Sequence, residues 1–195
     1  MTAAVILAAG GSSRLGRPKQ LVRLRGKTLV RHMVDGAFDA GCSPVVVVTG
    51  SNGEKIDHEL QQSRVVKIQN NSWQRGIGSS IRSGVKVLLD RAAKVDAVVL
   101  LVCDQPFVKA AMIRELISLS QNTGKEIVAS SYGNTLGVPA LFSRRFFHSL
   151  LSLEDGAGAK QIILRNRECV AEFLFPEGSI DIDSWSDYQR ATDGA

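Results

Sequence analysis

Residues 7–19, LAAGGSSRLGRPK, follow directly on a short apolar run at residues 3–6. The stretch combines three glycines with two arginines and a lysine. Glycine weakens strands and helices, but it allows positive φ and a close approach of the backbone to a ligand. Consecutive N–H groups of a glycine-rich turn form a concavity that binds anions. A buried strand followed by such a loop therefore predicts an α/β fold with an anion site at the end of its first strand.

Two familiar phosphate-binding motifs do not fit this loop. A P-loop needs GxxxxGK[ST]; Gly11 and Gly16 have that spacing, but arginine and proline follow. A dinucleotide fingerprint is missing too, since the next helix is expected only from Thr28, and this argues against a dinucleotide-dependent oxidoreductase. We expect a triphosphate cradle of another kind, in which Arg14 grips phosphate oxygens and Lys19 acts as a compact charge.

Composition and charge narrow the class of protein. The 195 residues are 44% hydrophobic and 22% charged, as in an ordinary globular protein, and no repeat or linker divides them. We therefore expect a single domain over residues 1–195. The net charge of +5 suits a protein that handles anions. The basic residues are scattered, however, with one adjacent pair at 144–145, so no nucleic-acid partner is expected.

Cysteine usage and the N-terminus exclude several further classes. The three cysteines, at 42, 103 and 169, lack the spacing of a zinc site. Cys103 follows an apolar run and is expected to be a buried small hydrophobe; a catalytic thiol is the alternative, although no histidine is placed to activate it. The N-terminal residues lack the basic region that is typical of a signal peptide, and the first apolar run is too short for a signal peptide or a membrane span, so neither is expected. A cytoplasmic protein without a membrane partner is expected.

Short apolar runs alternate with segments of helical period, which indicates βαβ units and a mainly parallel sheet. Strands are expected at 3–8, 45–49, 65–68, 96–102, 126–130, 136–142 and 169–173. Helices are expected at 28–40, 54–62, 79–91, 110–121, 144–151, 157–166 and 184–191. Pro139 could break the strand at 136–142. Ser184 and Asp187 fit a capping box at the start of the last helix.

The stretch at 7–19 resembles the signature LAAGxSxRMGxxK of the nucleotidyltransferases that act on the molybdenum-cofactor pterin. This resemblance implies a single-domain, Rossmann-like three-layer sandwich with a mostly parallel mixed sheet, as in nucleotide-diphospho-sugar transferases. It also implies that Arg14 and Lys19 are catalytic. The nucleotide-binding residues that the motif implies in this stretch are Leu7, Ala8, Ala9, Gly10, Gly11, Ser12, Ser13, Arg14 and Lys19.

Residues 70–80, NNSWQRGIGSS, precede or open a helix after the third strand. Ser79 and Ser80 are N-cap candidates, and the helix start offers free N–H groups to a polar ligand. The family has a similar NxxWxxGxxxS segment, which implies that Gly76 and Ser80 contact the base and that Trp73 shapes the pocket. Capping alone is the alternative for Ser80, and core packing is the alternative for Trp73.

Two aspartates are expected to hold magnesium. Asp104 ends a buried strand at the edge of the glycine loop, and Mg²⁺ takes one or two carboxylates together with substrate phosphates. The family has DxP at this position as a metal ligand, and Asp104 is also expected to be catalytic. The segment IDIDS at 180–184 resembles the family's DIDTPxD, and strand alternation places Asp181 and Asp183 on one face. Asp183 is the second metal candidate; the alternatives are a turn cap for Asp104 and a favourable helix-start charge for Asp183.

Two positions depart from the family pattern. Val138 stands where the family often has histidine, and Asp155-Gly156 reverses the first two residues of a GDxGA loop. Both changes fall in the half expected to hold the acceptor, so the acceptor stays open.

The expected function is magnesium-dependent transfer of a nucleoside monophosphate to a phosphorylated, pterin-like acceptor. The N-terminal half is expected to bind the NTP and the C-terminal half the acceptor. Ala8-Ala9-Gly10 resembles the cytidylyl branch of the family, which favours CTP over GTP. The alternatives are another acceptor, such as a sugar phosphate, and a nucleotide-binding accessory protein for molybdoenzyme maturation. A molybdoenzyme or its maturation chaperone is the expected protein partner.

Overall fold

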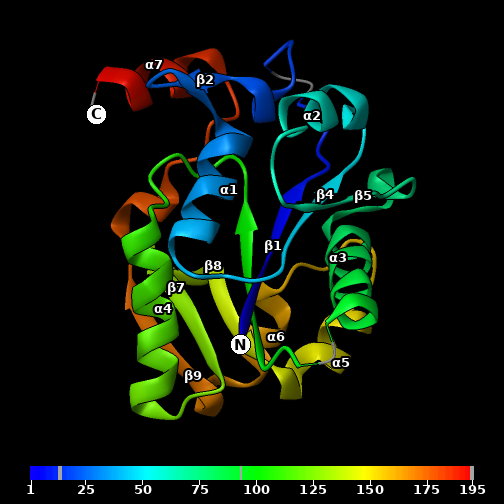
Figure 1. Cartoon of the computed structure of the whole chain (residues 1–195). Helices are drawn as coiled ribbons and strands as arrows, with labels where there is room; N and C mark the ends of the chain where they lie inside the picture. Colours follow the sequence, from blue (N-terminus) through cyan, green and yellow to red (C-terminus); the bar gives the residue numbers. More distant parts are fainter. Residues whose placement is uncertain (13–14, 93, 194–195) are drawn as a thin grey trace.

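A computed structural model describes residues 1–12, 15–92 and 94–193 (Figure 1). Seven strands form one sheet: β1 (Thr2–Ala8), β4 (Val45–Thr49), β5 (Val66–Gln69), β6 (Ala97–Val102), β7 (Ile127–Tyr132), β8 (Thr135–Ser143) and β9 (Val170–Leu174). Their order is β5-β4-β1-β6-β8-β7-β9. Strand β8 is antiparallel to both of its neighbours, and the other pairs are parallel. The predicted α/β class with a mostly parallel mixed sheet is confirmed.

Helices cover both faces of the sheet, which completes the predicted three layers (Figure 1). One face carries α1 (Leu29–Asp39), α2 (Gly53–Glu59) and α4 (Ala110–Thr123). The other face carries α3 (Ile77–Arg91), α5 (Phe147–Leu151) and α6 (Lys160–Arg165). Each face buries its own cluster of mainly aliphatic side chains against the central strands. The predicted helices are confirmed with shifted ends; the segment expected at 144–151, for example, begins as a 3₁₀ turn before α5.

The strand that contains Pro139 is continuous, so the break considered there does not occur. The register of β7 against β8 shifts between Ala129 and Ser130, opposite this part of β8. A bulge lets the hydrogen-bond ladder pass a proline, which has no N–H to donate. The hydroxyl of Ser130 donates to the carbonyl of Pro139 at 2.6 Å, which adds a bond at the irregular point.

A small hairpin, which was not predicted, joins β2 (Arg23–Leu24) to β3 (Lys27–Thr28). Arg25 and Gly26 form its two-residue loop and both have positive φ, 49° and 83°. Positive φ at both loop positions is the type I′ geometry that matches the twist of a hairpin. The last helix, α7 (Trp185–Asp193), shares a small apolar cluster with the hairpin region. Members of this cluster are Val22, Leu24, Leu29, Ile182 and Ala191.

The capping box predicted for α7 is confirmed. The N–H of Ser184 donates to Asp187 Oδ2 at 2.8 Å, and the N–H of Asp187 donates to Ser184 Oγ at 3.3 Å. The N–H of Asp183 also donates to Asp187 Oδ2, at 3.2 Å. Hydrogen bonds from Ser184 lower the pKa of Asp187 to about 2. The cap therefore fixes the main chain at Asp183.

Asp187→Ala is expected to lower the free energy of unfolding by about 1 kcal/mol at pH 7, because N–H groups at the start of α7 lose their acceptor. The pKa of this carboxyl falls from its ordinary value of about 4 to about 2 in the folded state. Its contribution is therefore complete above that ordinary value and is lost as the pH falls toward 2. Urea unfolding followed by circular dichroism at pH 7 and at pH 3 measures the effect.

The gap between wild type and Asp187→Ala should narrow at the lower pH. Asp90→Ala, which removes an exposed carboxylate on α3, is the control and should be close to neutral. An equal gap at both pH values would contradict the role assigned to the ionised cap.

Candidate active site

The carboxyl ends of β1, β4 and β6 meet at one edge of the sheet, and the loop rich in glycine follows β1 there. Open α/β sheets bind ligands at this edge. Gln20, 1% exposed, donates from Nε2 to the carbonyls of Ala8 (3.0 Å) and Gly10 (2.8 Å). The N–H of Lys19 donates to Ser12 Oγ at 2.9 Å. These bonds fold the loop back over the end of β1, and the anchoring role of Gln20 was not predicted.

Lys19 joins two carboxylates that come from distant parts of the chain. Its Nζ lies 2.6 Å from Asp104 Oδ2 and 2.9 Å from Asp183 Oδ1. Burial disfavours the charged ammonium, but attraction and hydrogen bonding to Asp104 and then to Asp183 outweigh it, so the pKa of Lys19 is raised. A bond from the N–H of Ile182 to the carbonyl of Asp104, 2.9 Å long, holds the two acidic segments together. The three side chains selected from the sequence thus meet in one place.

A cavity of about 290 Å³, here the nucleotide cavity, lies beside this cluster. Predicted site residues that line it are Leu7, Ala9, Gly10, Lys19, Gly76, Ser80 and Asp104. Ala8, Gly11 and Ser12 do not line it. Ser13 and Arg14 lie outside the residues that the structure describes.

Trp73 forms part of the cavity wall and is half-buried. A Cβ at Gly11 would lie 3.0 Å from its ring, and a Cβ at Gly50 would lie 2.8 Å from it. Gly50 would also place that Cβ 2.4 Å from the carbonyl oxygen of Ala9. The loops after β1 and β4 therefore pack on the indole through two glycines, and at Gly50 there is no room for a Cβ. Of the two interpretations considered for Trp73, this geometry favours a pocket wall over core packing.

Ser79 and Ser80 are not N-caps, which corrects the prediction. Helix α3 begins at Ile77 and the N-cap position is Gly76, so both serines lie in the first turn. Asn70 Nδ2 donates to both hydroxyls, at 2.9 Å and 3.0 Å. The sequence predicts capping because serine is common at helix starts. The hydrogen bonds from Asn70, which lies nine and ten residues before these serines, cannot be predicted from the sequence pattern.

The loop at residues 153–158 covers the beginning of α3. The N–H of Gly78 donates to the carbonyl of Asp155 at 2.8 Å. A Cβ at Gly76 would lie 2.4 Å from that same oxygen, and the φ of Gly76 is 128°. Glycine is therefore required at this position both by the close contact and by the positive φ. One of the predicted free N–H groups of this helix is therefore occupied by the chain itself.

Asp155 also makes two ion pairs across this contact. Its Oδ2 lies 2.6 Å from Arg75 Nε, and its Oδ1 pairs with Arg82. The hydrogen bond from Arg82 is the main reason that the pKa of Asp155 lies below its ordinary value. Asp155-Gly156 is one of the two departures from the family pattern, and from the sequence it is assigned to the half expected to hold the acceptor. The structure shows that Asp155 lies against the predicted base-binding segment.

At the other departure, Val138, the side chain packs against the core and the backbone joins a hydrogen-bond network. Its carbonyl accepts hydrogen bonds from the Tyr132 hydroxyl (2.9 Å) and from Gln105 Nε2 (3.2 Å). Gln105 is 2% exposed and also donates to the carbonyl of Gly178 at 2.9 Å. The valine position therefore belongs to a network that fixes the loop after Asp104.

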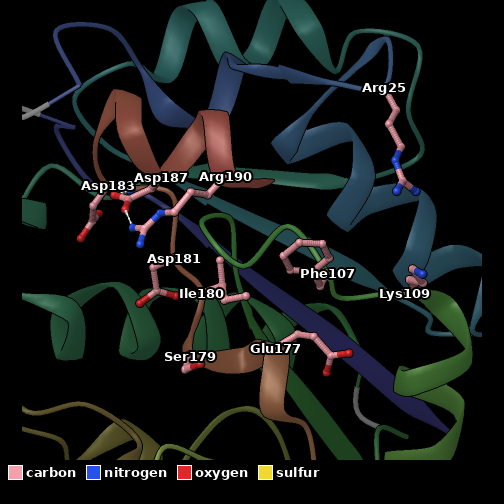
Figure 2. A pocket seen from close by; sticks show the side chains of 10 residues that line it. All are labelled: Arg25, Phe107, Lys109, Glu177, Ser179, Ile180, Asp181, Asp183, Asp187 and Arg190. Carbon is pink, nitrogen blue, oxygen red and sulfur yellow. Dashed lines mark hydrogen bonds and ion pairs between the residues drawn. The ribbon is translucent and has the colours of Figure 1, made fainter. Parts of the chain in front are cut away.

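A second cavity of about 670 Å³, here the outer cavity, is lined by Asp183 and by residues of the hairpin, of the loop before α4 and of α7 (Figure 2). No strand forms at 180–183, unlike the expectation. Asp181 and Asp183 nevertheless both line the outer cavity, whereas Ile182 between them is fully buried. Burial, followed by repulsion from Asp104 and Asp183, raises the pKa of Asp181 to about 6.

Helix α7 also contacts the glycine-rich loop. The guanidinium of Arg17 lies 4.5 Å from the ring centroid of Trp185, which stacks on Tyr188 at a centroid distance of 4.8 Å. The hydroxyl of Tyr188 donates to the carbonyl of Arg23 at 2.9 Å. A cation over an aromatic face is attracted by the ring quadrupole. The C-terminal helix is thereby tied to both ends of the segment at residues 17–23.

Cys103 lies in the wall of the nucleotide cavity but is 2% exposed. Burial, followed by repulsion from Asp104, raises the pKa of its thiol well above the ordinary value. A thiolate nucleophile is therefore disfavoured. The geometry agrees with the expected role of a buried small side chain.

The carboxylates of Asp104 and Asp183 suit a divalent cation that shares its coordination with phosphates. They lie within hydrogen-bond distance of a common cation, the Lys19 ammonium, so the pair already accommodates positive charge. In the part of the chain that the structure describes, no group of three His, Cys, Asp or Glu side chains is arranged to hold a metal. A divalent ion held by these two carboxylates would take its other ligands from substrate or water oxygens.

Comparisons with known proteins identify the family of this chain and agree with its fold. The model of the MobA-like NTP transferase domain matches residues 4–170. Nicotine blue oxidoreductase of Paenarthrobacter nicotinovorans is 31% identical over 87% of this chain and 84% of that protein. A probable molybdenum cofactor guanylyltransferase of Opitutus terrae is 32% identical over 58% of this chain, which spans 53% of that relative.

Solved structures agree over nearly the full length. The crystal structure of Rv0371c from Mycobacterium tuberculosis H37Rv is 30% identical, with a TM-score of 0.81 over 98% of this chain and 97% of that chain. Its complex with manganese has a TM-score of 0.77 at 27% identity, over 100% and 99% of the two chains. Together, the fold and these matches define a protein of the nucleotidyltransferase class. The chain belongs to the MobA-like NTP transferase family, which confirms the resemblance in the 7–19 stretch.

Within residues 1–12, 15–92 and 94–193, no helix is both long enough and apolar enough to cross a membrane.

Gly78→Ala is expected to destabilise the fold by about 2 kcal/mol, in the range of overpacked positions. Its Cβ would lie 2.0 Å from the carbonyl oxygen of Glu154 and 2.8 Å from that of Ala157, so the loop must move. Gly156→Ala in the same loop meets nothing within 4 Å and is the matched control. Urea unfolding of both variants measures the difference. Equal stability of the two would contradict the close contact between this loop and α3.

Proposed function

We propose that this chain is a magnesium-dependent nucleotidyltransferase that moves a nucleoside monophosphate from an NTP to a phosphorylated acceptor. The contact of Lys19 with Asp104 and Asp183 at the nucleotide cavity carries the proposal. One domain performs the reaction, the N-terminal half holding the NTP and the C-terminal half holding the acceptor. Membership of the MobA-like NTP transferase family supports the reaction class.

In the proposed reaction, a phosphate oxygen of the acceptor attacks the α-phosphorus of the NTP. A new P–O bond forms, the bond to the bridging oxygen breaks, and pyrophosphate leaves with its electron pair. The reaction depends on in-line positioning and on neutralising charge rather than on a protein nucleophile. The site supplies cations and carboxylates for this purpose, and its buried thiol is not needed.

The loop residues bind and orient the triphosphate. Gly10, Gly11 and Ser12 offer backbone N–H donors, and the ammonium of Lys19 stabilises the negative charge that develops. Arg14 has the same role, as the family motif implies. Asp104 and Asp183 hold the magnesium ion, which neutralises phosphate oxygens as a Lewis acid when bound.

The proposed donor is CTP, with GTP as the alternative, and the proposed acceptor is molybdopterin or a related molybdenum-cofactor pterin. Gly76 and Ser80 contact the base, and both line the nucleotide cavity with Trp73. The resemblance of Ala8-Ala9-Gly10 to the cytidylyl branch supports CTP. The similarity to the Opitutus terrae protein supports a molybdenum-cofactor acceptor. A molybdoenzyme or its maturation chaperone receives the product.

Three other functions are kept as alternatives. The acceptor could be a different phosphorylated molecule such as a sugar phosphate, or the chain could bind nucleotide as an accessory protein without releasing pyrophosphate. Identity of 31% to nicotine blue oxidoreductase supports a redox enzyme as a further candidate. Oxidation of NADH or NADPH without pyrophosphate release would distinguish that candidate.

The central assay measures pyrophosphate release from each of the four NTPs with magnesium, with and without molybdopterin. Release is expected with CTP only when molybdopterin is present. Lys19→Ala and Asp104→Ala should each lower turnover by about a hundredfold or more, the range for removing one charge-stabilising group. Lys86→Ala and Asp90→Ala, exposed positions on α3, are the matched controls and should keep wild-type turnover.

Turnover within a few-fold of wild type in both Lys19→Ala and Asp104→Ala would overturn the assignment of the site. Tight nucleotide binding without pyrophosphate release from any NTP would support the accessory protein instead.

Chelation by EDTA should abolish pyrophosphate release, and excess Mg²⁺ or Mn²⁺ should restore it, because the two carboxylates need a cation to position phosphates. The manganese complex of Rv0371c supports a divalent ion in a related protein. Asp183→Asn should raise the Mg²⁺ concentration needed for half-maximal rate, whereas Asp90→Asn should not. An EDTA-resistant rate would exclude the metal.

A further inference from the structure

One wall of the nucleotide cavity is built around a bend in the chain at Gly76. The 3₁₀ turn Trp73–Arg75 ends at this glycine, and α3 begins at the next residue. The φ of 128° at Gly76 turns the chain sharply between the two elements. Trp73 before the bend and Ile77 and Ser80 after it all line the nucleotide cavity. The shape of this wall therefore depends on the angle at which the chain leaves Gly76.

The loop at residues 153–158 packs on this bend from outside the cavity. It follows α5, which packs beside α3 (Figure 1). Among the residues that the structure describes, no member of this loop lines the nucleotide cavity. Any effect of the loop on a bound nucleotide must therefore pass through the bend.

Asp155 in this loop contacts the chain on both sides of Gly76. Its Oδ2 lies 2.6 Å from Arg75 Nε, in the turn before the bend. Its Oδ1 pairs with Arg82, and its carbonyl oxygen accepts from the N–H of Gly78 at 2.8 Å, both in α3 after the bend. A single residue thus ties the turn to the helix.

Arg82 is the more sheltered of the two cationic partners. Its side chain is 29% exposed, whereas that of Arg75 is 67% exposed, and water screens an exposed ion pair. Arg82 also donates to the carbonyl of Leu153, so it holds the loop at two points. The pair of Asp155 with Arg82 is therefore the main side-chain contact across this interface.

We propose that Asp155 is a positioning residue for the nucleotide: by fixing the bend at Gly76 it holds the cavity wall that contacts the base. The phosphate end of the cavity is formed by other segments, which include Gly10 and Lys19. Asp155 therefore governs affinity for the nucleoside part of the nucleotide and not affinity for its phosphates. This role rests on the nucleotide site proposed above.

Isothermal titration calorimetry of the full chain tests this role with two kinds of ligand. The first is the magnesium complex of CTP or GTP, the two proposed donors, and the second is magnesium tripolyphosphate, which carries phosphates without a base. Asp155→Ala should weaken binding of the preferred nucleotide by about tenfold, the effect of losing a hydrogen bond to a charged group. Its affinity for tripolyphosphate should equal that of wild type.

Two further variants and a control make the test specific. Arg82→Ala should weaken nucleotide binding as Asp155→Ala does, and the double variant should bind no more weakly than the more affected single variant, because both act through one contact. Glu154→Ala removes an exposed carboxylate from the same loop and makes the same change in net charge, so it should bind both ligands as wild type does. Thermal unfolding checks that each variant is folded. Asp155→Asn keeps the shape of the side chain and should shift nucleotide affinity in the same direction if the alanine variant is unstable.

The positioning role and the transferase proposal fail in different ways. Equal nucleotide affinity in wild type, Asp155→Ala and Arg82→Ala would overturn the positioning role, and so would a parallel loss of nucleotide and tripolyphosphate affinity. If wild type releases pyrophosphate and Asp155→Ala keeps the wild-type KM for the NTP, the positioning role fails while the transferase proposal stands. If nucleotide affinity alone falls in the variants but wild type releases no pyrophosphate from any NTP, the positioning role is supported and the transferase proposal fails.

Discussion

The contact of Lys19 with Asp104 and Asp183 is the interaction on which the rest of the site depends. Partly buried charges lose hydration, and such a cluster persists only where each charge has a close partner. Here one ammonium serves two carboxylates, at 2.6 Å and 2.9 Å. The cluster joins the loop after the first strand, the loop after β6 and the segment before the last helix. Both cavities border on it, so it defines where two ligands could meet.

Local patterns in the sequence were sufficient for the sheet and for the choice of Lys19 and Asp104, whereas the choice of Asp183 also relied on the resemblance of residues 180–184 to a family segment. Each strand is a short apolar run, and residues that follow parallel strands are brought to the same edge of a sheet. Asp104 could be selected because it ends such a run, and the cap of α7 because its two partners lie three residues apart. Ser13 and Arg14 remain predictions of the motif alone.

What could not be predicted depends on contacts between distant residues. Gln20 anchors the loop because its side-chain amide donates to the backbone carbonyls of Ala8 and Gly10. The two serines at the start of α3 accept hydrogen bonds from Asn70 and do not cap the helix. Asp155 lies against α3 because glycines there permit backbone contact, a property that the sequence of either segment does not contain by itself. The glycine of the Arg25-Gly26 pair is compatible with a turn, but the two-residue strands on either side are too short to show the alternation of apolar and polar residues that predicts a strand.

The dependence of Asp183 on α7 has a mechanical consequence. The main chain at Asp183 is fixed by Asp187 within α7, and the side chain of Asp183 accepts a hydrogen bond from the ammonium of Lys19 at 2.9 Å. The same helix packs on the hairpin region through the cluster that contains Ile182 and Ala191. A displacement of α7 would therefore carry the second carboxylate away from the ammonium, so the position of this helix and the charge balance at Lys19 are coupled.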